Sequence, residues 1–169
     1  MTAHTNLLIT RLVSDLAKTK KPIIQLMAKS PSSKAAQELL DHLSEIRAKG
    51  ILVKAVFASA PSDSTFVTEM DKVYGAGAAH QLIRVSNLIK FDGAREQINF
   101  GKTAFWIGNR MNALMSAGLE RGALHRVTGK TARLSNIAFV SAWAHATPVV
   151  RAPVVTNDNK AQLKLAIAS

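Results

Sequence analysis

One segment in the first third of the chain constrains the fold most, because it has the pattern of a strand, a helix and a second strand. Residues 23–28 form a short apolar run between breakers, which favours a buried strand. Ser32 or Ser33 can then cap a helix, and Gly50 stands where a left-handed residue ends one. Residues 51–58 are rich in valine and isoleucine and predict the second strand. The inward stripe of the intervening helix consists of Ala36, Leu39, Leu40, Leu43 and Ile46. This order is typical of a βαβ crossover in the α/β class.

The rest of the chain predicts further elements around this unit. Helices are expected over residues 5–18, 65–74, 109–117 and 131–146. The last of these should carry Leu134, Ile137, Ala138 and Ser141 on one side. Strands are expected over residues 82–86, 88–91, 96–100, 103–107 and 124–127, the last as a central strand. We therefore expect a mixed β-sheet flanked by helices in one α/β domain over residues 1–147, with residues 148–169 as a C-terminal extension or tail.

Composition excludes several classes of protein. Hydrophobic residues make up 47% of the 169 positions, which is enough for a packed core and argues against a disordered chain. The absence of cysteine excludes disulfides, thiolate zinc sites and cysteine nucleophiles. The longest charge-free stretch, residues 134–150, is too polar to span a bilayer, and the start lacks the basic region of a secretory signal. We expect a cytoplasmic protein without a membrane span.

Positive charge is concentrated towards the end of the chain. The formal net charge is +11, and residues 121–169 hold seven basic residues against a single acidic one, Asp158. Such asymmetry indicates a surface that faces a polyanion, although charge can also serve solubility alone. Aromatic residues are few, with six Phe, two Trp and one Tyr. Contact with nucleic acid would therefore be made mainly to phosphates and not by base stacking.

The histidines form no complete catalytic or metal-binding motif. They stand at positions 4, 42, 80, 125 and 145. His42 and Glu45 are three residues apart, and we expect them to form a solvated ion pair on an exposed helix face. Nucleophile-elbow, zinc-protease, phosphate-loop and dinucleotide-binding signatures are all missing from the sequence. We therefore expect no metal and no cofactor.

The stretch ELLDHLSEIRAKGILVKAVFA, residues 38–58, and the order of helices and strands around it resemble the N-terminal part of the phospholipase D-like fold. The chemistry of that family rests on an H-x-K-x4-D motif followed by a G-S/T-x-N type segment. Its histidine attacks a phosphodiester phosphorus, and its lysine stabilises charge on the phosphoryl oxygens. The resemblance covers roughly residues 5–143 and implies a phospholipase D-like half-domain.

The catalytic motif itself is missing. The residues two places after the five histidines are Asn6, Ser44, Leu82, Val127 and Thr147, so the sequence contains no H-x-K. The window of best shape is FGKTAFWIG, which places Phe100, Lys102 and Ile107 where the family has His, Lys and Asp. The resemblance thus implies a catalytically degenerate, single-copy member. Active single-copy members pair two copies, and by analogy we expect a homodimer.

These observations favour a non-enzymatic protein that holds phosphates of nucleic acid or another polyanion. Its predicted contacts are Arg126, Lys130 and Arg133, with Lys102 and Arg110 at the relict cleft. Asn109 and Arg110 could offer an amide and a guanidinium to an anion at a helix N-terminus. Alternatively, Asn109 is simply the helix cap and Arg110 is solvated. Trp106 is expected to be a core or interface residue.

Two other functions remain open. An enzyme for a small phosphorylated or anionic substrate would use His80 or His125 with the neighbouring Arg84 or Arg126. Strand alternation places His125 and Arg126 on opposite sides, which counts against that pair. A purely structural or partner-binding protein would instead show a large exposed apolar patch.

Overall fold

A computed structural model describes residues 3–87, 96–107 and 125–150. Its helices are α1 (Ala3–Leu16), α2 (Lys34–Leu40), α3 (Leu43–Ala48), α4 (Thr65–Tyr74), α5 (Ala78–Leu82) and α7 (Gly129–Ala144). Its strands are β1 (Ile23–Ala28), β2 (Leu52–Phe57), β3 (Ile83–Val85), β4 (Glu96–Phe100), β5 (Thr103–Ile107), β6 (His125–Thr128) and β7 (Thr147–Pro148). The strands form one sheet in the order β6-β5-β4-β1-β2-β3-β7.

The sheet is mixed, as the sequence predicts. Strands β1, β2 and β3 run parallel, so α2 and α3 make the expected crossover between β1 and β2. Strand β4 pairs antiparallel with β1, and β5 and β6 continue antiparallel from it. At the other edge β7 pairs antiparallel with β3. The hairpin of β4 and β5 therefore extends the parallel core on one side.

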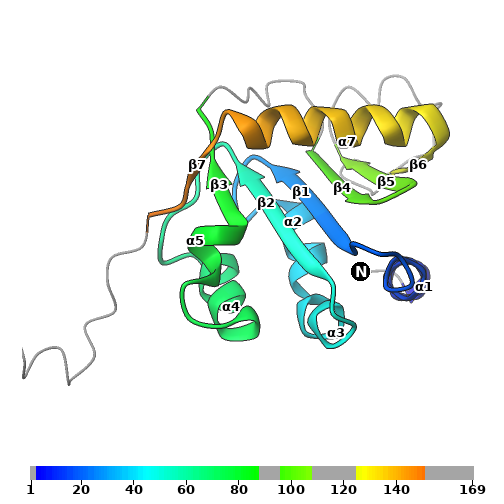
Figure 1. The fold of residues 1–169 in the computed structure, drawn as a ribbon, viewed down its shortest axis with the longest axis horizontal. Coiled ribbons are helices and arrows are strands. Elements are labelled where there is room, and N and C mark those ends of the chain that lie inside the picture. The colour runs from blue at the N-terminus through cyan, green and yellow to red at the C-terminus, as the bar shows by residue number, and fades with distance from the viewer. Residues whose placement is uncertain (1–2, 88–95, 108–124, 151–169) are drawn as a thin grey trace, which may run out of the picture.

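Helices cover the two faces of the sheet unequally. Helix α7 lies along one face, while α2 to α5 lie on the other, with α1 near the β4–β6 end (Figure 1). The main hydrophobic core lies on the side of α1 to α5, because alternate strand residues point there and pack against those helices. Two smaller apolar clusters form under α7, around Phe139 and Trp106. The α7 side is thus the thinner and more polar layer.

The predicted helix after β1 is divided in two. Its stripe is buried as expected at Ala36, Leu39, Leu43 and Ile46, but α2 ends at Leu40 and α3 begins at Leu43. Gly50 adopts φ +73 and ends α3 in the predicted left-handed conformation. Ser33 precedes α2 without capping it through its side chain, because its hydroxyl accepts the Ser30 N–H at 3.0 Å.

Most strand predictions are confirmed, with two corrections. Residues 78–82 form α5, so the strand predicted to begin at residue 82 begins at Ile83. Strand β6 was expected to be central, but it lies at the sheet edge beyond β5. The reason is that sheet order depends on pairing between distant segments, which local apolar runs do not encode. The strand predicted over residues 88–91 and the helix predicted over residues 109–117 lie outside the described residues.

Helix α7 presents a different side to the sheet than its apolar residues predict. Leu134 and Ile137 are 59% and 57% exposed, whereas Ala132, Ser135 and Phe139 are buried. The β4 strand beneath the helix carries Gln97 and Asn99 on this face, and both need hydrogen-bond partners. Small and polar groups of α7 therefore face the sheet. In the described part of the chain, none of the helices has the length and apolar character needed to cross a membrane.

Candidate functional site

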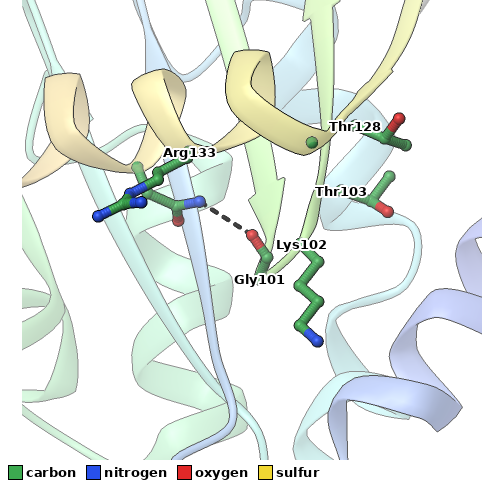
Figure 2. A pocket seen from close by; sticks show the side chains of 7 residues that line it. Gly101, Lys102, Thr103, Thr128 and Arg133 are labelled. Carbon is green, nitrogen blue, oxygen red and sulfur yellow. Dashed lines mark hydrogen bonds between the residues drawn. The ribbon is translucent and has the colours of Figure 1, made fainter.

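A pocket of about 550 Å³ lies between the β4–β5 turn and the start of α7 (Figure 2). We call it the Lys102 pocket, and its lining residues are Gly101, Lys102, Thr103, Thr128, Gly129, Arg133 and Asn136. One side chain ties its two walls together, because Asn136 Nδ2 donates to the Gly101 carbonyl oxygen at 2.9 Å. The same amide nitrogen is 2.9 Å from the Ala132 carbonyl oxygen within α7. The helix and the hairpin turn are therefore held in register at the pocket.

Two glycines shape the backbone of the Lys102 pocket. Gly101 has φ +70 in the tight turn between β4 and β5, and Gly129 has φ +61 where the chain leaves β6 for α7. Both lie in the left-handed region that side chains with a Cβ disfavour. Thr128 is extended before α7 and makes no side-chain cap hydrogen bond. Strand β6 therefore passes directly into α7, with no residue between Thr128 and Gly129.

The pocket is electrostatically positive. Lys102 and Arg133 line it, and no carboxylate stands among the described lining residues. Lys130 is exposed in the first turn of α7, where the helix dipole adds partial positive charge. In the described ranges, the salt bridges are formed by Lys18, His42 and Lys72, so Lys102 and Arg133 keep their charge available. Phosphate, sulfate or carboxylate groups are the ligands that such a pocket can bind.

The structure brings together only some of the predicted contact residues. Lys102 and Arg133 share one pocket, and Lys130 stands beside it on α7. Arg126 lines a second pocket of about 260 Å³ next to α1. We call this the Arg126 pocket, and it is lined by Leu8, Arg11, Leu12, Asp15 and Arg126. Arg110 lies outside the described residues.

In the window that resembles the family motif, Phe100 and Lys102 do not face the same cleft. Phe100 is only 5% exposed and packs edge-on against Phe105, with ring centroids 5.8 Å apart. Lys102 lies in the exposed turn that follows β4, and Ile107 ends β5. Strand and turn thus direct Phe100 into the core and leave Lys102 at the surface. The alignment that places Phe100 at a catalytic histidine position therefore has no support in the packing.

The histidines do not assemble the alternative active site. His80 Nδ1 lies 3.0 Å from the Val149 carbonyl oxygen, while Arg84 points to the other face of the sheet and donates to the Trp143 carbonyl oxygen at 2.8 Å. His125 is buried and Arg126 is exposed, as strand alternation predicts. In the described part of the chain, neither of the two pockets is lined by a histidine.

His42 corrects a prediction about the α3 region. Its imidazole was expected on an exposed helix face, but the residue is buried at the junction of α2 and α3. His42 Nδ1 lies 3.5 Å from Glu45 Oε2, so the predicted pair exists in a partly buried setting. His42 is the residue that precedes α3, three residues after the buried Leu39 and four before the buried Ile46.

A buried polar layer between β4 and α7 was not predicted. Gln97 Nε2 and Asn99 Nδ2 donate to the Ser135 carbonyl oxygen at 2.7 and 3.2 Å, and Asn99 also donates to Gln25 Oε1 at 3.0 Å. Trp106 is buried and donates from its indole nitrogen to the Ser135 hydroxyl, in agreement with the prediction of a core or interface residue. The alternation of polar residues at 97 and 99 was the available signal. This layer positions α7, and with it Arg133, over the sheet.

A second unpredicted cluster lies at the C-terminal end of α7. Lys54 Nζ lies 5.0 Å and Arg84 Cζ 4.3 Å from the ring centroid of Trp143, and Phe139 stacks with the same ring. Cations near a helix C-terminus offset the partial negative charge of its last carbonyl groups. Lys54 and Arg84 therefore help to hold the C-terminal end of α7 against the sheet.

Comparison with known proteins supports the fold. The sequence matches no protein-family model and no curated protein sequence. The structure is similar to the crystal structure of a phospholipase D family member, NUC from Salmonella typhimurium, with a TM-score of 0.50 and 14% sequence identity. The match covers 85% of this chain and 91% of that chain. At this identity the likeness bears on the fold alone, and with the mixed sheet and its helices it supports a phospholipase D-like α/β fold.

Proposed function

We propose that this protein binds the phosphates of nucleic acid or another polyanion at the Lys102 pocket and does not cut them. Lys102, Lys130 and Arg133 supply the charge at the pocket. Arg110 and Arg126 are the remaining predicted contacts. Binding of this kind is driven mainly by the release of counterions from the polyanion.

The observation that carries the proposal is that two cations from distant segments line the same pocket. Lys102 comes from the β4–β5 turn and Arg133 from α7, yet both line one pocket that has no carboxylate among its described residues. A pocket lined by two cations and no described counter-charge has a positive potential, which favours the binding of an anion. The turn glycines and the Asn136 hydrogen bond hold this arrangement without using either cation.

The non-catalytic part of the proposal rests on the sequence. No histidine is followed two places later by lysine, so the nucleophile and charge stabiliser of the family motif cannot be supplied in the usual spacing. Phe100, at the matching position of the best window, packs in the core and has no nucleophilic atom.

Salt titration tests the binding. Affinity for a fluorescent oligonucleotide should fall steeply as salt is added, and Lys102→Gln or Arg133→Gln should each lower the slope of log affinity against log salt by about one. Lys72→Gln removes the same charge from α4, on the opposite side of the sheet, and should leave the slope unchanged. Binding that does not respond to salt, or no binding at low salt, would contradict the proposal.

Turnover is tested separately. A chromogenic phosphodiester incubated with the protein should be hydrolysed no faster than in buffer. Hydrolysis that grows with protein concentration and is lost in His80→Gln or His125→Gln would establish the enzymatic alternative. Binding without turnover supports both halves of the proposal.

A second candidate function is self-association through α7. Leu134, Ile137 and Val140 are 57–59% exposed and follow one another at three-residue intervals on the outer side of the helix. The cations of α7 are confined to its first turns at Lys130 and Arg133, and the helix has no acidic residue. Antiparallel packing of two α7 helices would bury the stripe and place each pair of cations near the C-terminal end of the other helix.

Sedimentation equilibrium tests this second candidate. The protein should be dimeric, and Ile137→Lys should shift it to the monomer while leaving the circular dichroism spectrum unchanged. The Lys72→Gln variant should remain dimeric, because α4 lies on the opposite side of the sheet from α7 (Figure 1). A monomeric protein at all concentrations would contradict self-association.

A further inference from the structure

The edge strand β6 connects the two pockets. Arg126 and Thr128 stand two residues apart in β6, so their side chains point to the same face of the sheet and are separated by about 7 Å. Thr128 lines the Lys102 pocket and Arg126 lines the Arg126 pocket. Register supports this placement, because Thr103 pairs with Thr128 and Phe105 pairs with Arg126 across the β5–β6 ladder. The two pockets are therefore neighbours along one edge of the molecule.

The Arg126 pocket is positive despite one carboxylate. Arg11 of α1 and Arg126 of β6 are both exposed and both line it. Asp15 also lines it, but its carboxylate oxygen lies 3.3 Å from Lys18 Nζ, which offsets its charge. The lining residues of the Arg126 pocket therefore carry two positive charges against one negative charge. Arg11 was not among the residues singled out by the sequence, because its helix carries little net charge.

The cations of the Lys102 pocket do not converge on one point. Figure 2 shows Arg133 on one side of the Gly101 carbonyl group and Lys102 on the other, both extending away from the helix axis. A single compact anion would be gripped best by cations that point at the same place. Cations spread along a line suit an extended ligand with charges at intervals.

We propose that the two pockets form one cationic track along β6, running from Arg133 and Lys102 to Arg126 and Arg11, and that its ligand is the phosphate backbone of a nucleic-acid strand several nucleotides long. The proposal rests on the function proposed above and extends it to a second pocket and to a polymeric ligand. Each strand of nucleic acid rises about 3.4 Å per nucleotide, so the spacing of about 7 Å between Arg126 and Thr128 spans two nucleotides. A mononucleotide or free phosphate would occupy the Lys102 pocket alone.

Fluorescence anisotropy with two ligands tests the track. The ligands are a labelled mononucleotide and a labelled oligonucleotide of about ten nucleotides, which is roughly 34 Å long at 3.4 Å per nucleotide. Arg11→Gln and Arg126→Gln are the test variants, and Lys72→Gln on α4 is the control for net charge. All three side chains are exposed, so each variant is expected to fold, and circular dichroism verifies this.

The expected result is specific to length. Arg11→Gln and Arg126→Gln should each weaken binding of the long oligonucleotide and lower its salt slope by about one, while binding of the mononucleotide stays unchanged. Lys72→Gln should affect neither ligand. One outcome would contradict the track alone: Lys102→Gln and Arg133→Gln weaken binding of the long oligonucleotide, but Arg11→Gln and Arg126→Gln bind it as well as Lys72→Gln does. The proposed phosphate binding at the Lys102 pocket would then stand. If neither ligand binds the unmodified protein at low salt, both proposals fail.

Discussion

The indole nitrogen of Trp106 on β5 donates a hydrogen bond to the hydroxyl of Ser135 on α7, across the buried space between sheet and helix. The same serine offers its carbonyl oxygen to Gln97 and Asn99 of β4. Ser135 thus accepts hydrogen bonds from three side chains on two neighbouring strands. Because Arg133 lies two residues before it, this polar contact also positions one wall of the Lys102 pocket.

Ser135→Ala should destabilise the protein by about 1 kcal/mol, because it removes a buried hydrogen bond from Trp106. Ser141→Ala makes the same substitution on an exposed side of α7 and should change stability by no more than about 0.5 kcal/mol. Urea unfolding followed by tryptophan fluorescence measures both. Equal stability of the two variants would show that the Ser135 hydroxyl contributes nothing to the packing of α7.

Two isoleucines distinguish the buried sheet from the outer side of α7. Ile98 of β4 is 1% exposed and Ile137 of α7 is 57% exposed. Ile98→Ala should cost about 2–5 kcal/mol through lost burial and the cavity left behind. Ile137→Ala should stay within about 0.5 kcal/mol for the monomer, because its side chain contacts mainly solvent. Thermal unfolding of both variants measures the difference, and a large loss in Ile137→Ala would mean that this side of α7 is covered.

Gly129 should resist replacement for a conformational reason. Its φ is +61, and a Cβ at this position would meet no atom within 4 Å. Gly129→Ala should therefore cost about 1–2 kcal/mol from backbone strain alone, and Gly129→Asn less, because asparagine tolerates the left-handed region. Chemical denaturation compares the two. A larger loss for asparagine than for alanine would indicate a steric cause and contradict this account.

Tyr74 should give a measurable dependence on alkaline pH. Burial raises the pKa of Tyr74 to about 12, although the nearby Arg47 guanidinium opposes part of the rise. The hydroxyl donates to the Ile51 carbonyl oxygen at 2.8 Å, which requires the protonated form. With a folded pKa above the unfolded value of about 10, its contribution to stability is complete below pH 10 and is lost as the pH rises towards 12.

This residue is the only tyrosine in the chain, so ultraviolet titration reports it directly. The folded protein should form tyrosinate with a midpoint well above that of the urea-unfolded protein. Tyr74→Phe should lose less stability than the unmodified protein between pH 10 and pH 12, because phenylalanine cannot ionise. Identical midpoints in the folded and unfolded protein would contradict the buried position of the hydroxyl.

The local sequence pattern was sufficient to predict those helices and strands whose bounds depend on residues within or next to the segment. Strands β1, β4 and β5 and helix α4 have the predicted bounds, and Gly50 ends α3 as expected. Each depends on breakers, β-branched runs or helical spacing that lie within the segment itself. The α/β class followed from the order of these segments. The absence of an H-x-K motif was likewise readable from the sequence without a structure.

Other features required the tertiary structure. The inward side of α7 is chosen by Gln97 and Asn99 on β4, which need hydrogen-bond partners and so draw Ser135 inward in place of Leu134 and Ile137. The edge position of β6 and the meeting of Lys102 with Arg133 depend on pairing between segments far apart in the chain. The sequence by itself determined which segments become helix or strand and how much positive charge the chain carries. Only packing decided where that charge gathers, because proximity between distant residues is set by the sheet order and by the buried polar contacts that hold α7 upon it.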